Sequence, residues 1–456
     1  MSEISPLTFT KKSQTTTSNL RLLVLSNGHG EDVIAVRILR ELQQQQSSLE
    51  IFALPIVGEG HAYQKLDIPV IGSVHSMPSG GFIYQDARQL SKDVRSGLLG
   101  LTLNQIQIIR RWVKIQKKSG YSAKILAVGD IVPLLFAWLS GSEYAFVGTA
   151  KSEYYLRDET GWLKRDTQAA GWEGWSGSVY LPWERWLMSR KRCKAVFPRD
   201  SLTTKILKQW KIPAFDLGNP MMDGLEPSFP QKSFYTSDTR KEEIQRALAI
   251  ALLPGSRIPE AYANWEKITV AVSALIATFC EQDFIGHTSG NIVFLTGIAP
   301  GLDCNILTET LKNQGWDPVP KEDSPVNIPD NQALTFKHKN AFIILTQTAY
   351  NDCLHLGDIA IAMAGTATEQ FVGLGKPAIT IPGNGPQFTP LFAEAQTRLL
   401  GSSVILVEKP SDVASEIKNL FNNPDRLHMI ANNGKQRMGE PGAAKRISEC
   451  LIKKWA

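Results

Sequence analysis

Residues 358–390 read Asp-Ile-Ala-Ile-Ala-Met-Ala-Gly-Thr-Ala-Thr-Glu-Gln-Phe-Val-Gly-Leu-Gly-Lys-Pro-Ala-Ile-Thr-Ile-Pro-Gly-Asn-Gly-Pro-Gln-Phe-Thr-Pro, and this stretch decides the fold. The continuous apolar run at 359–364 predicts a strand that is buried on both faces. A helix follows to about Gly373, and residues 378–381 predict the next buried strand. Strand, helix and strand make a β-α-β unit, and open α/β sheets bind ligands at the carboxyl ends of such strands.

The start of the predicted helix has the chemistry of a phosphate and ribose site. Gly365 and Ala367 are small, so a ligand can approach the helix N-terminus, whose free N–H groups and dipole suit a phosphate. Glu369, one turn further on, can accept hydrogen bonds from a ribose diol. Thr366 and Glu369 also have the spacing of a capping box, in which both side chains only satisfy backbone donors. Both interpretations are open from the spacing alone.

Three features of this stretch resemble the nucleotide-sugar half of GT-B glycosyltransferases, and lipid-A-disaccharide synthases in particular. They are the Gly-Thr-Ala-Thr-Glu element, the Gly-Lys-Pro that follows it and the Gly-rich loop that contains Gln387. In such enzymes a Glu at this place holds the ribose of UDP, so the resemblance implies this role for Glu369. It also implies that the donor is contacted by further residues of the element and the loop, namely Gly365, Thr366, Ala367, Thr368 and Gln387.

A second element of the same predicted domain also points to a diphosphate. Residues 248–253 predict a strand that ends at Pro254-Gly255-Ser256-Arg257. The Gly-Ser turn exposes backbone N–H groups, and Arg257 can pair bidentately with a diphosphate. The Leu-Leu-Pro-Gly-Ser-Arg stretch resembles the lipid-A-disaccharide synthase pattern, which implies that Gly255, Ser256 and Arg257 bind the donor. A surface arginine in a turn is the alternative.

The first half of the chain repeats the alternation of strands and helices. Residues 20–25 predict a strand, residues 26–32 a Gly-containing turn and residues 33–44 a helix, which together form the first unit of a doubly wound domain. Further strands are expected at 51–57, 68–72, 125–128, 144–147, 195–197 and 215–220.

Inverting glycosyl transfer needs a base near the acceptor hydroxyl. Asp130 follows a predicted strand, and the turn after the first strand offers His29, Glu31 and Asp32. Lipid-A-disaccharide synthases carry an Asp at that turn, so the resemblance implies Asp32, and a corresponding Asp in a strand-end segment supports Asp130. His29 is not part of that pattern, and a turn residue that binds backbone is the alternative for it.

These elements predict an α/β chain with the GT-B fold, in which two Rossmann-like doubly wound domains face an interdomain cleft. The expected order is a disordered tail, an acceptor-side domain, a linker, a nucleotide-sugar domain and a basic helix that packs back on the first domain. Their expected bounds are 1–19, 20–217, 218–240, 241–439 and about 440–456.

Composition narrows the class of protein. The 456 residues are enough for two full cores, and the five cysteines are odd in number and have no Cys-x-x-Cys pair, which indicates reduced thiols in a cytoplasmic protein. A net charge of +5 suits an anionic ligand or membrane surface, and no stretch is long enough to span a bilayer. Because the sequence has no Asp-x-Asp motif and no zinc spacing, we expect no metal, no cofactor and no nucleic-acid partner. Helix N-termini and Arg257 would then stabilise the leaving group.

Three segments of the first half predict peripheral contact with an anionic membrane. An apolar, Gly-rich stretch contains Phe82, a basic helix covers 105–118, and five of the eleven tryptophans lie between Trp162 and Trp186 near a cluster of Arg and Lys. Tryptophan and basic side chains favour the headgroup region, so we expect Phe82, Trp183 and Trp186 to contact membrane or acceptor. A solvated helix face and aromatic packing under a long loop are the alternatives.

The sequence therefore predicts an inverting, metal-independent glycosyltransferase similar to the lipid-A-disaccharide synthases of lipid A biosynthesis. It would transfer sugar from UDP to a lipid or glycolipid at the inner face of the plasma membrane. Two alternatives stay open. One is an isomerase like UDP-N-acetylglucosamine 2-epimerase, which would need more cleft carboxylates and histidines and no hydrophobic acceptor surface. The other, supported by the altered first turn, is a relative that binds a glycolipid or nucleotide sugar without turnover.

Overall fold

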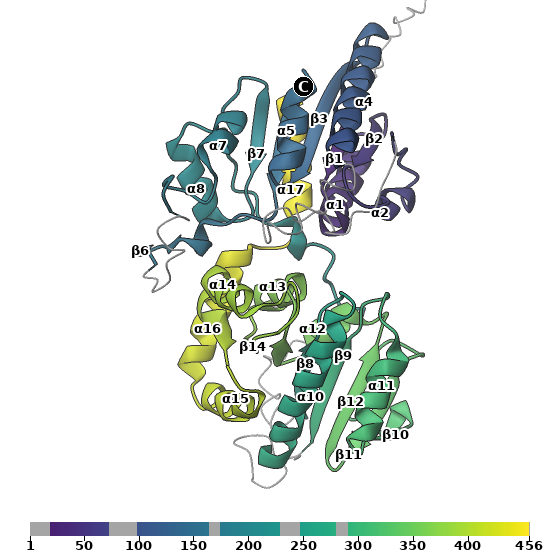
Figure 1. The fold of residues 1–456 in the computed structure, drawn as a ribbon, viewed down its shortest axis with the longest axis vertical. Helices are drawn as coiled ribbons and strands as arrows, with labels where there is room; N and C mark the ends of the chain where they lie inside the picture. The colour runs from purple at the N-terminus through teal and green to yellow at the C-terminus, as the bar shows by residue number, and fades with distance from the viewer. Residues whose placement is uncertain (1–18, 73–97, 164–173, 229–246, 280–290, 456) are drawn as a thin grey trace, which may run out of the picture.

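The computed structural model describes residues 19–72, 98–163, 174–228, 247–279 and 291–455. Two sheets, each with helices packed on it, lie one above the other in Figure 1. This arrangement confirms the predicted α/β fold with two Rossmann-like domains. Residues 1–18 of the predicted tail and Phe82 lie outside the described residues.

The first sheet has the strand order β2-β1-β3-β4-β7, and all of its pairings are parallel. Because the chain passes from β1 to β2 on one side and to β3 on the other, the topological switch point lies between β1 and β3. The strands are β1 (Leu20–Ser26), β2 (Glu50–Pro55), β3 (Ser122–Gly129), β4 (Glu143–Gly148) and β7 (Cys193–Phe197).

Helices cover both faces of this sheet, since successive residues of a strand point to opposite sides. Leu23 and Leu25 of β1 pack with α4, α5 and α7, whereas Leu22 and Val24 pack with α1 and α17. The last helix of the chain, α17, therefore completes the core of the first domain (Figure 1). The helices are α1 (His29–Gln45), α2 (His61–Gln64), α4 (Leu98–Lys118), α5 (Ile131–Leu139), α7 (Pro182–Met188), α8 (Ser201–Gln209) and α17 (Ala443–Trp455).

Two predicted strands of the first domain are wrong. Residues 68–72 contribute only the isolated bridge between Ala53 and Val70, and residues 215–220 contribute none, since the bridge between Val196 and Ala214 lies just before them. Pro69 and Pro213 adjoin these bridges and have no N–H to donate, which limits further pairing. Short elements after β4 are η1 (Glu153–Tyr155), β5 (Arg157–Asp158) and β6 (Gly161–Trp162).

The second sheet has the order β10-β11-β12-β9-β8-β13-β14-β15, parallel from β12 to β15 and antiparallel at the β10 edge. The chain leaves β8 for β9 on one side and later adds β13 on the other, so this switch point lies between β8 and β13. The strands are β8 (Leu248–Leu253), β9 (Ile292–Gly297), β10 (Asp317–Val319), β11 (Leu334–His338), β12 (Ala341–Thr346), β13 (Ile359–Ala362), β14 (Ala378–Thr380) and β15 (Val404–Leu406).

The helices of the second domain bury the sheet as the continuous apolar strands predict. Trp265 of α10 is among the largest fully buried side chains. No described helix combines the length and apolar character needed to cross a membrane. The helices are α10 (Glu260–Phe279), α11 (Cys304–Asn313), α12 (Tyr350–Leu356), α13 (Thr366–Gly373), α14 (Pro390–Leu400), α15 (Val413–Phe421) and α16 (Pro424–Met438), with short turns η2 (Pro220–Met222), η3 (Lys321–Asp323), η4 (Gly401–Ser403) and η5 (Pro410–Asp412).

The two domains are joined by apolar packing as well as by the chain. Tyr154 and Ile206 of the first domain share a buried cluster with Phe371 and Leu399 of the second. Where the chain returns to the first domain, Asp223 accepts hydrogen bonds from the N–H groups of Gly442 (2.5 Å), Ala443 (3.1 Å) and Ala444 (2.6 Å). This carboxylate caps α17. It also joins the segment at Asp223, where the chain leaves the first domain, to the segment at 442–444, where the chain returns.

We expect Asp223→Ala to lower the free energy of unfolding by about 1–2 kcal/mol, because three backbone donors at the start of α17 lose their acceptor. Urea denaturation followed by circular dichroism measures the effect. The exposed Asp216→Ala is the matched control, and equal stability of the two variants would show that the cap contributes nothing.

Candidate functional site

The strand-end turn after β8 is built to expose its backbone. Gly255 has a φ of +97°, and a Cβ there would lie 3.3 Å from the carbonyl oxygen of Met363. The Asn264 amide donates to the carbonyls of Pro254 (3.0 Å) and Met363 (3.2 Å), so it joins the ends of β8 and β13. Ser256 and Arg257, which follow, are exposed. The two strand ends at the switch point thus form one fixed edge.

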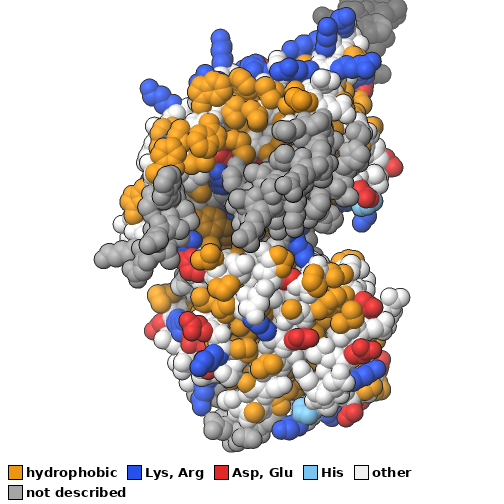
Figure 2. Space-filling view, viewed as in Figure 1, with side chains coloured by type: hydrophobic (Ala, Val, Ile, Leu, Met, Phe, Trp, Pro, Cys, Tyr) orange, Lys and Arg blue, Asp and Glu red, His pale blue; other side chains and the backbone are white. Residues whose placement is uncertain are grey.

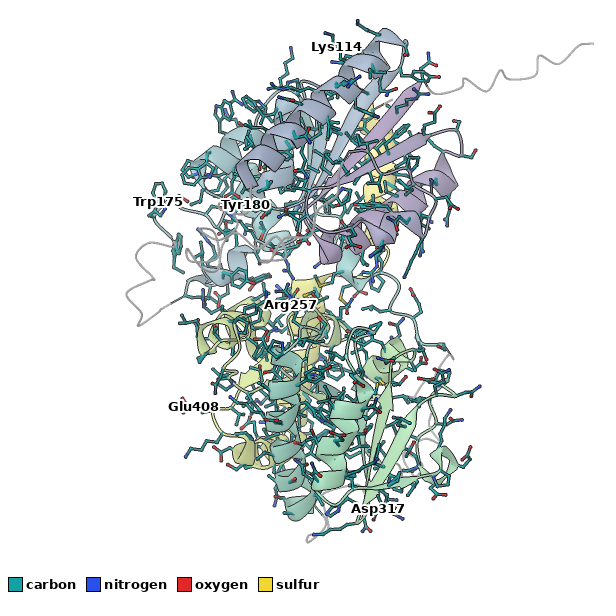
Figure 3. The ribbon with its side chains drawn as sticks, turned by 45° about the vertical axis from the view of Figure 1, so that its right-hand side comes forward. Lys114, Trp175, Tyr180, Arg257, Asp317 and Glu408 are labelled. Atoms are coloured by element: carbon teal, nitrogen blue, oxygen red, sulfur yellow. The ribbon has the colours of Figure 1, made fainter. Side chains whose placement is uncertain are left out.

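Arg257 lies at the boundary between the two domains (Figure 3). Its pKa is lowered, mainly by partial burial, while the carboxylates of Glu260 and Glu31 act in the opposite direction. Glu31 lies in the first turn of α1, just after β1 of the first domain, so the guanidinium of the second domain interacts electrostatically with that end of the first domain. The two switch points therefore face each other.

The helix after β13 begins where the sequence predicted, at Thr366, but the capping box is not formed. Gly365 occupies the N-cap position without a side-chain cap, and Thr366 is exposed in the first turn. The Thr368 hydroxyl donates inward to the carbonyl of Ala364 at 2.6 Å. Thr366 stands one position too late to cap, so the N-cap residue provides no side-chain acceptor for the first N–H groups of α13.

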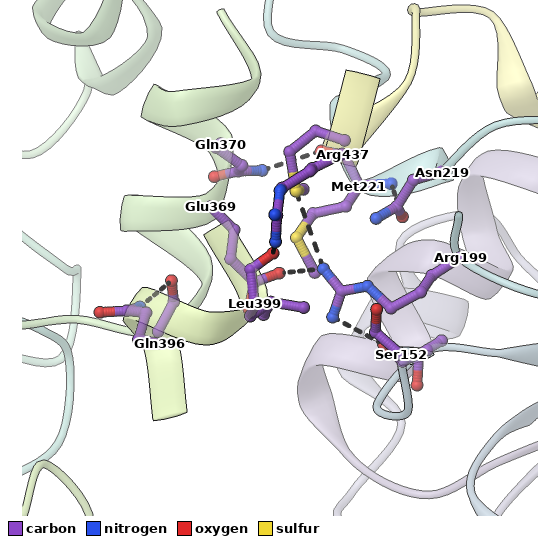
Figure 4. Close-up of polar contacts among 12 residues, drawn as sticks. Ser152, Arg199, Asn219, Met221, Glu369, Gln370, Gln396, Leu399 and Arg437 are labelled. Carbon is purple, nitrogen blue, oxygen red and sulfur yellow. Dashed lines mark hydrogen bonds and ion pairs between the residues drawn. The ribbon is translucent and has the colours of Figure 1, made fainter. Parts of the chain in front are cut away.

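Glu369 forms an ion pair with the other domain. Arg199, just after β7, donates from Nη2 to Glu369 Oε2 at 2.5 Å and from Nη1 to the carbonyl of Thr149 at 3.2 Å (Figure 4). Both side chains are nearly buried, with 4% exposure for Arg199 and 11% for Glu369. The pKa of Arg199 is raised, because the attraction of Glu369 outweighs the opposing effect of burial.

The loop that contains Gln387 is shaped by a carboxylate beneath it. Glu260 Oε1 accepts from the backbone N–H groups of Gln387 (3.1 Å) and Phe388 (2.6 Å). A Cβ at Gly385 would lie 2.1 Å from the same oxygen, so a side chain there would displace the Glu260 carboxylate. This places the backbone of Gln387 against the start of α10, on the same side of the sheet as Arg257.

The first domain brings carboxylates to the facing edge. Asp130 accepts from the backbone N–H of Val132 at 2.9 Å and so caps α5, and the Thr149 hydroxyl donates to Glu31 at 3.4 Å. Burial raises the pKa of Asp130 to about 6, an effect that the nearby Glu31 and Glu184 carboxylates strengthen. Burial also raises the pKa of Glu31. Asp130 is therefore suited to exchange a proton near neutral pH, and the pKa of Glu31 is shifted in the same direction.

Asp32 has a different environment from Asp130. It is 2% exposed, and its Oδ1 accepts from the Ser26 hydroxyl at 2.5 Å, which in turn accepts from Tyr63 at 2.6 Å. Burial raises the pKa of Asp32 to about 7, although the hydrogen bond from Ser26 lowers it. This buried network orients the turn beneath Glu31, and it does not expose Asp32 to an acceptor. The side chain of His29 lies outside the described part of the chain.

Sequence reasoning missed Arg199. It also did not connect Lys151 and Glu184, which form a buried ion pair at 2.6 Å beside Asp130. The signal for Arg199 and Lys151 was present, because each follows a first-domain strand as Asp130 does. Among the described residues, no group of three or more His, Cys, Asp or Glu side chains is placed to hold a metal ion.

Several solved structures have a similar architecture. Similar chains include UDP-GlcNAc 2-epimerase from Neisseria meningitidis bound to UDP-GlcNAc (14% identity, TM-score 0.51, covering 95% of this chain and 100% of that one). Others are MurG from Acinetobacter baumannii (13%, 0.53, 95% and 99%) and CalG4, the calicheamicin glycosyltransferase (11%, 0.54, 95% and 98%). At these identities the similarity shows the fold, which is GT-B. No protein-family model matches the chain, and no curated protein matches it.

Because Asp32 is buried, the free energy of unfolding should fall as the pH rises. The folded state binds this proton more tightly than the unfolded chain, in which the pKa is near 3.8. The stability of the folded state that depends on protonated Asp32 is therefore fully present below about pH 4 and is lost as the pH rises through 7.

We expect Asp32→Asn to be more stable than the wild type at pH 8 by roughly 2–4 kcal/mol and to show a flatter pH profile. Denaturant unfolding from pH 5 to pH 8 tests this, with the exposed Asp216→Asn as control. A profile for Asp32→Asn that parallels the wild type would remove Asp32 as the cause.

Proposed function

We propose that this protein is an inverting glycosyltransferase that takes a UDP-sugar donor and a lipid or glycolipid acceptor, without a metal ion. The observation that carries the proposal is that the switch points of two Rossmann-like domains face each other with complementary chemistry. The second domain supplies Arg257 and the N-terminus of α13, and the first supplies Glu31 and Asp130. One edge suits an anionic leaving group and the other suits a general base.

In this proposal the donor lies on the second domain. The diphosphate contacts Arg257, the backbone at Gly255 and Ser256, and the α13 N-terminus at Gly365, Thr366 and Ala367, while the Glu369 carboxylate holds the ribose. Thr368 supports the first turn from inside. Departing UDP gains charge at the β-phosphate, and Arg257 stabilises that charge without a metal ion. The structural neighbour from Neisseria meningitidis, which binds UDP-GlcNAc, supports this choice of nucleotide.

Asp130 and Glu31 are the candidates for the base that takes the acceptor proton. Each is partly accessible at the first-domain edge, and each has a raised pKa. Asp32, which the family resemblance implied, instead supports this turn through Ser26 and Tyr63. His29 lies on the same turn, and we retain it as a candidate contact to the acceptor.

A surface of the first domain supports a lipid acceptor at a membrane. Trp183 and Trp186 of α7 are 51% and 44% exposed, so they do not belong to the core. Trp186 packs edge-on against Trp138 and lies under the guanidinium of Arg190. Figure 2 shows hydrophobic side chains gathered over this part of the domain, with Lys and Arg around its upper edge. Such a surface suits peripheral binding at the cytoplasmic face of an anionic membrane, as in lipid A biosynthesis.

A UDP-N-acetylglucosamine 2-epimerase-like isomerase is the second candidate, because an epimerase is among the structural neighbours and the first edge holds several carboxylates. Incubation with labelled UDP-sugars and a lipid extract separates the possibilities. Sugar in the lipid phase supports the transferase, and an epimeric UDP-sugar formed without lipid supports the isomerase. Binding without either product would support a relative that lacks turnover.

We expect Arg257→Lys to lower turnover by on the order of 100-fold and UDP affinity far less, because the planar fork is lost while the charge remains. The reason is that charge grows on the diphosphate in the transition state. Turnover and calorimetric UDP affinity are measured together, with the exposed Arg111→Lys of α4 as control. Equal losses in both quantities, or none, would remove Arg257 from the leaving-group site.

We expect the double variant Trp183→Ser, Trp186→Ser to stay folded and to lose flotation with phosphatidylglycerol vesicles at low salt. Indoles favour the headgroup level, and each nearby cation adds about 1 kcal/mol on anionic lipid. A matched control replaces two exposed apolar residues of the second domain, Leu391 and Met429, by Ser. If the wild-type protein does not float with these vesicles, the proposal of membrane contact is wrong.

A further inference from the structure

The carboxylate proposed to hold the ribose is not supported by its own domain alone. Glu369 lies on α13 of the second domain, yet its Oε2 accepts a hydrogen bond at 2.5 Å from Arg199 of the first. The other oxygen, Oε1, has no hydrogen-bond donor among the described residues. One carboxylate oxygen is thus fixed by Arg199, and the other is left to accept from a ligand.

Two further contacts fix the guanidinium of Arg199. Its second terminal nitrogen donates to the carbonyl of Thr149 at the end of β4, and its Nη2 also lies 3.8 Å from the Met438 sulfur. The guanidinium therefore spans from a strand end of one domain to a helix of the other. A lysine has one terminal nitrogen and cannot reproduce both directions.

Burial makes the position of the Glu369 carboxylate depend on this contact. The side chain is 11% exposed, and removal of one member of a buried ion pair leaves the other without its partner. Without Arg199, the Glu369 side chain would lose the donor that fixes Oε2 and would be free to turn toward water. That change removes an acceptor that a ribose diol needs.

We propose that Arg199 is a positioning residue of the donor site, which holds the Glu369 carboxylate in the orientation that the two ribose hydroxyls require. This inference rests on the proposed ribose role of Glu369. Because Arg199 belongs to the first domain, recognition of the ribose depends on both domains, although the nucleotide lies on the second. The apolar packing of Tyr154 and Ile206 against Phe371 and Leu399 keeps the two partners within reach.

The test compares calorimetric binding of UDP with that of 2′,3′-dideoxy-UDP, which lacks the diol. We expect Arg199→Gln to weaken UDP binding about tenfold and to leave binding of the dideoxy nucleotide unchanged, because only the diol uses Glu369. Arg199→Lys should fall between Arg199→Gln and the wild type. The double variant Arg199→Gln, Glu369→Gln should bind UDP no more weakly than Glu369→Gln alone, since the two residues act as one unit.

A second interdomain contact supplies the control. Gln436 of α16 donates to Glu159 of the first domain at 2.8 Å and does not contact Glu369. Gln436→Ala should bind both nucleotides as the wild type does, and circular dichroism verifies that each variant is folded.

The outcomes separate this inference from the proposal on which it rests. If the wild type does not prefer UDP over the dideoxy nucleotide, the ribose role of Glu369 fails and this inference fails with it. If the wild type prefers UDP and Arg199→Gln keeps that preference, only the role of Arg199 is overturned. Tighter UDP binding by Arg199→Gln would show that Arg199 competes with the ribose, and equal loss of both nucleotides would show a merely structural role.

Discussion

The buried ion pair between Arg199 and Glu369 is the contact on which the arrangement of the site depends. A charge removed from water is tolerated only with a partner and further hydrogen bonds, and here the partner lies on the other domain. The pair fixes the end of β7 against the first turn of α13. It therefore sets the distance between the two sheet edges more sharply than apolar packing does, since packing has no comparable directionality.

The strand ends of the two sheets present different groups at the domain boundary, because the segments that follow the strands differ. On the second domain, Gly255 and the amide of Asn264 expose and join the backbone at the ends of β8 and β13, and Gly385 lets the loop after β14 approach Glu260. That edge presents N–H groups and a guanidinium. On the first domain, burial of Glu31 and Asp130 raises their pKa values toward neutrality. In the proposed reaction, the second domain would stabilise the anionic leaving group and the first domain would supply the proton acceptor.

Much of the fold was predictable because both sheets are buried on two faces. Continuous apolar runs such as 359–364 mark parallel strands, and the residues that follow them mark the ligand edge. The segment at 68–72 did not form a strand because Pro69, which has no N–H to donate, adjoins its single bridge, whereas the bridge to β7 lies at Ala214, before the predicted segment at 215–220 begins. The bounds of the tail, the linker and the two domains remain predictions.

The site was less predictable, since its contacts join residues that are far apart in sequence. The spacing of Thr366 and Glu369 could not reveal that Arg199, 170 positions away, pairs with the carboxylate. Nor could it show that Tyr63 and Ser26 enclose Asp32. The exposure of Trp183 and Trp186 agrees with the surface interpretation, although a bound lipid remains a proposal.

Hydrogen–deuterium exchange with and without UDP tests the central claim most directly, namely that both switch points form a single nucleotide site. The account predicts that UDP slows exchange at 254–257 and 365–369 of the second domain, and also at the first-domain strand ends near Glu31 and Arg199. Protection confined to the second domain would contradict a site shared by both domains. Protection at neither switch point would contradict the site itself.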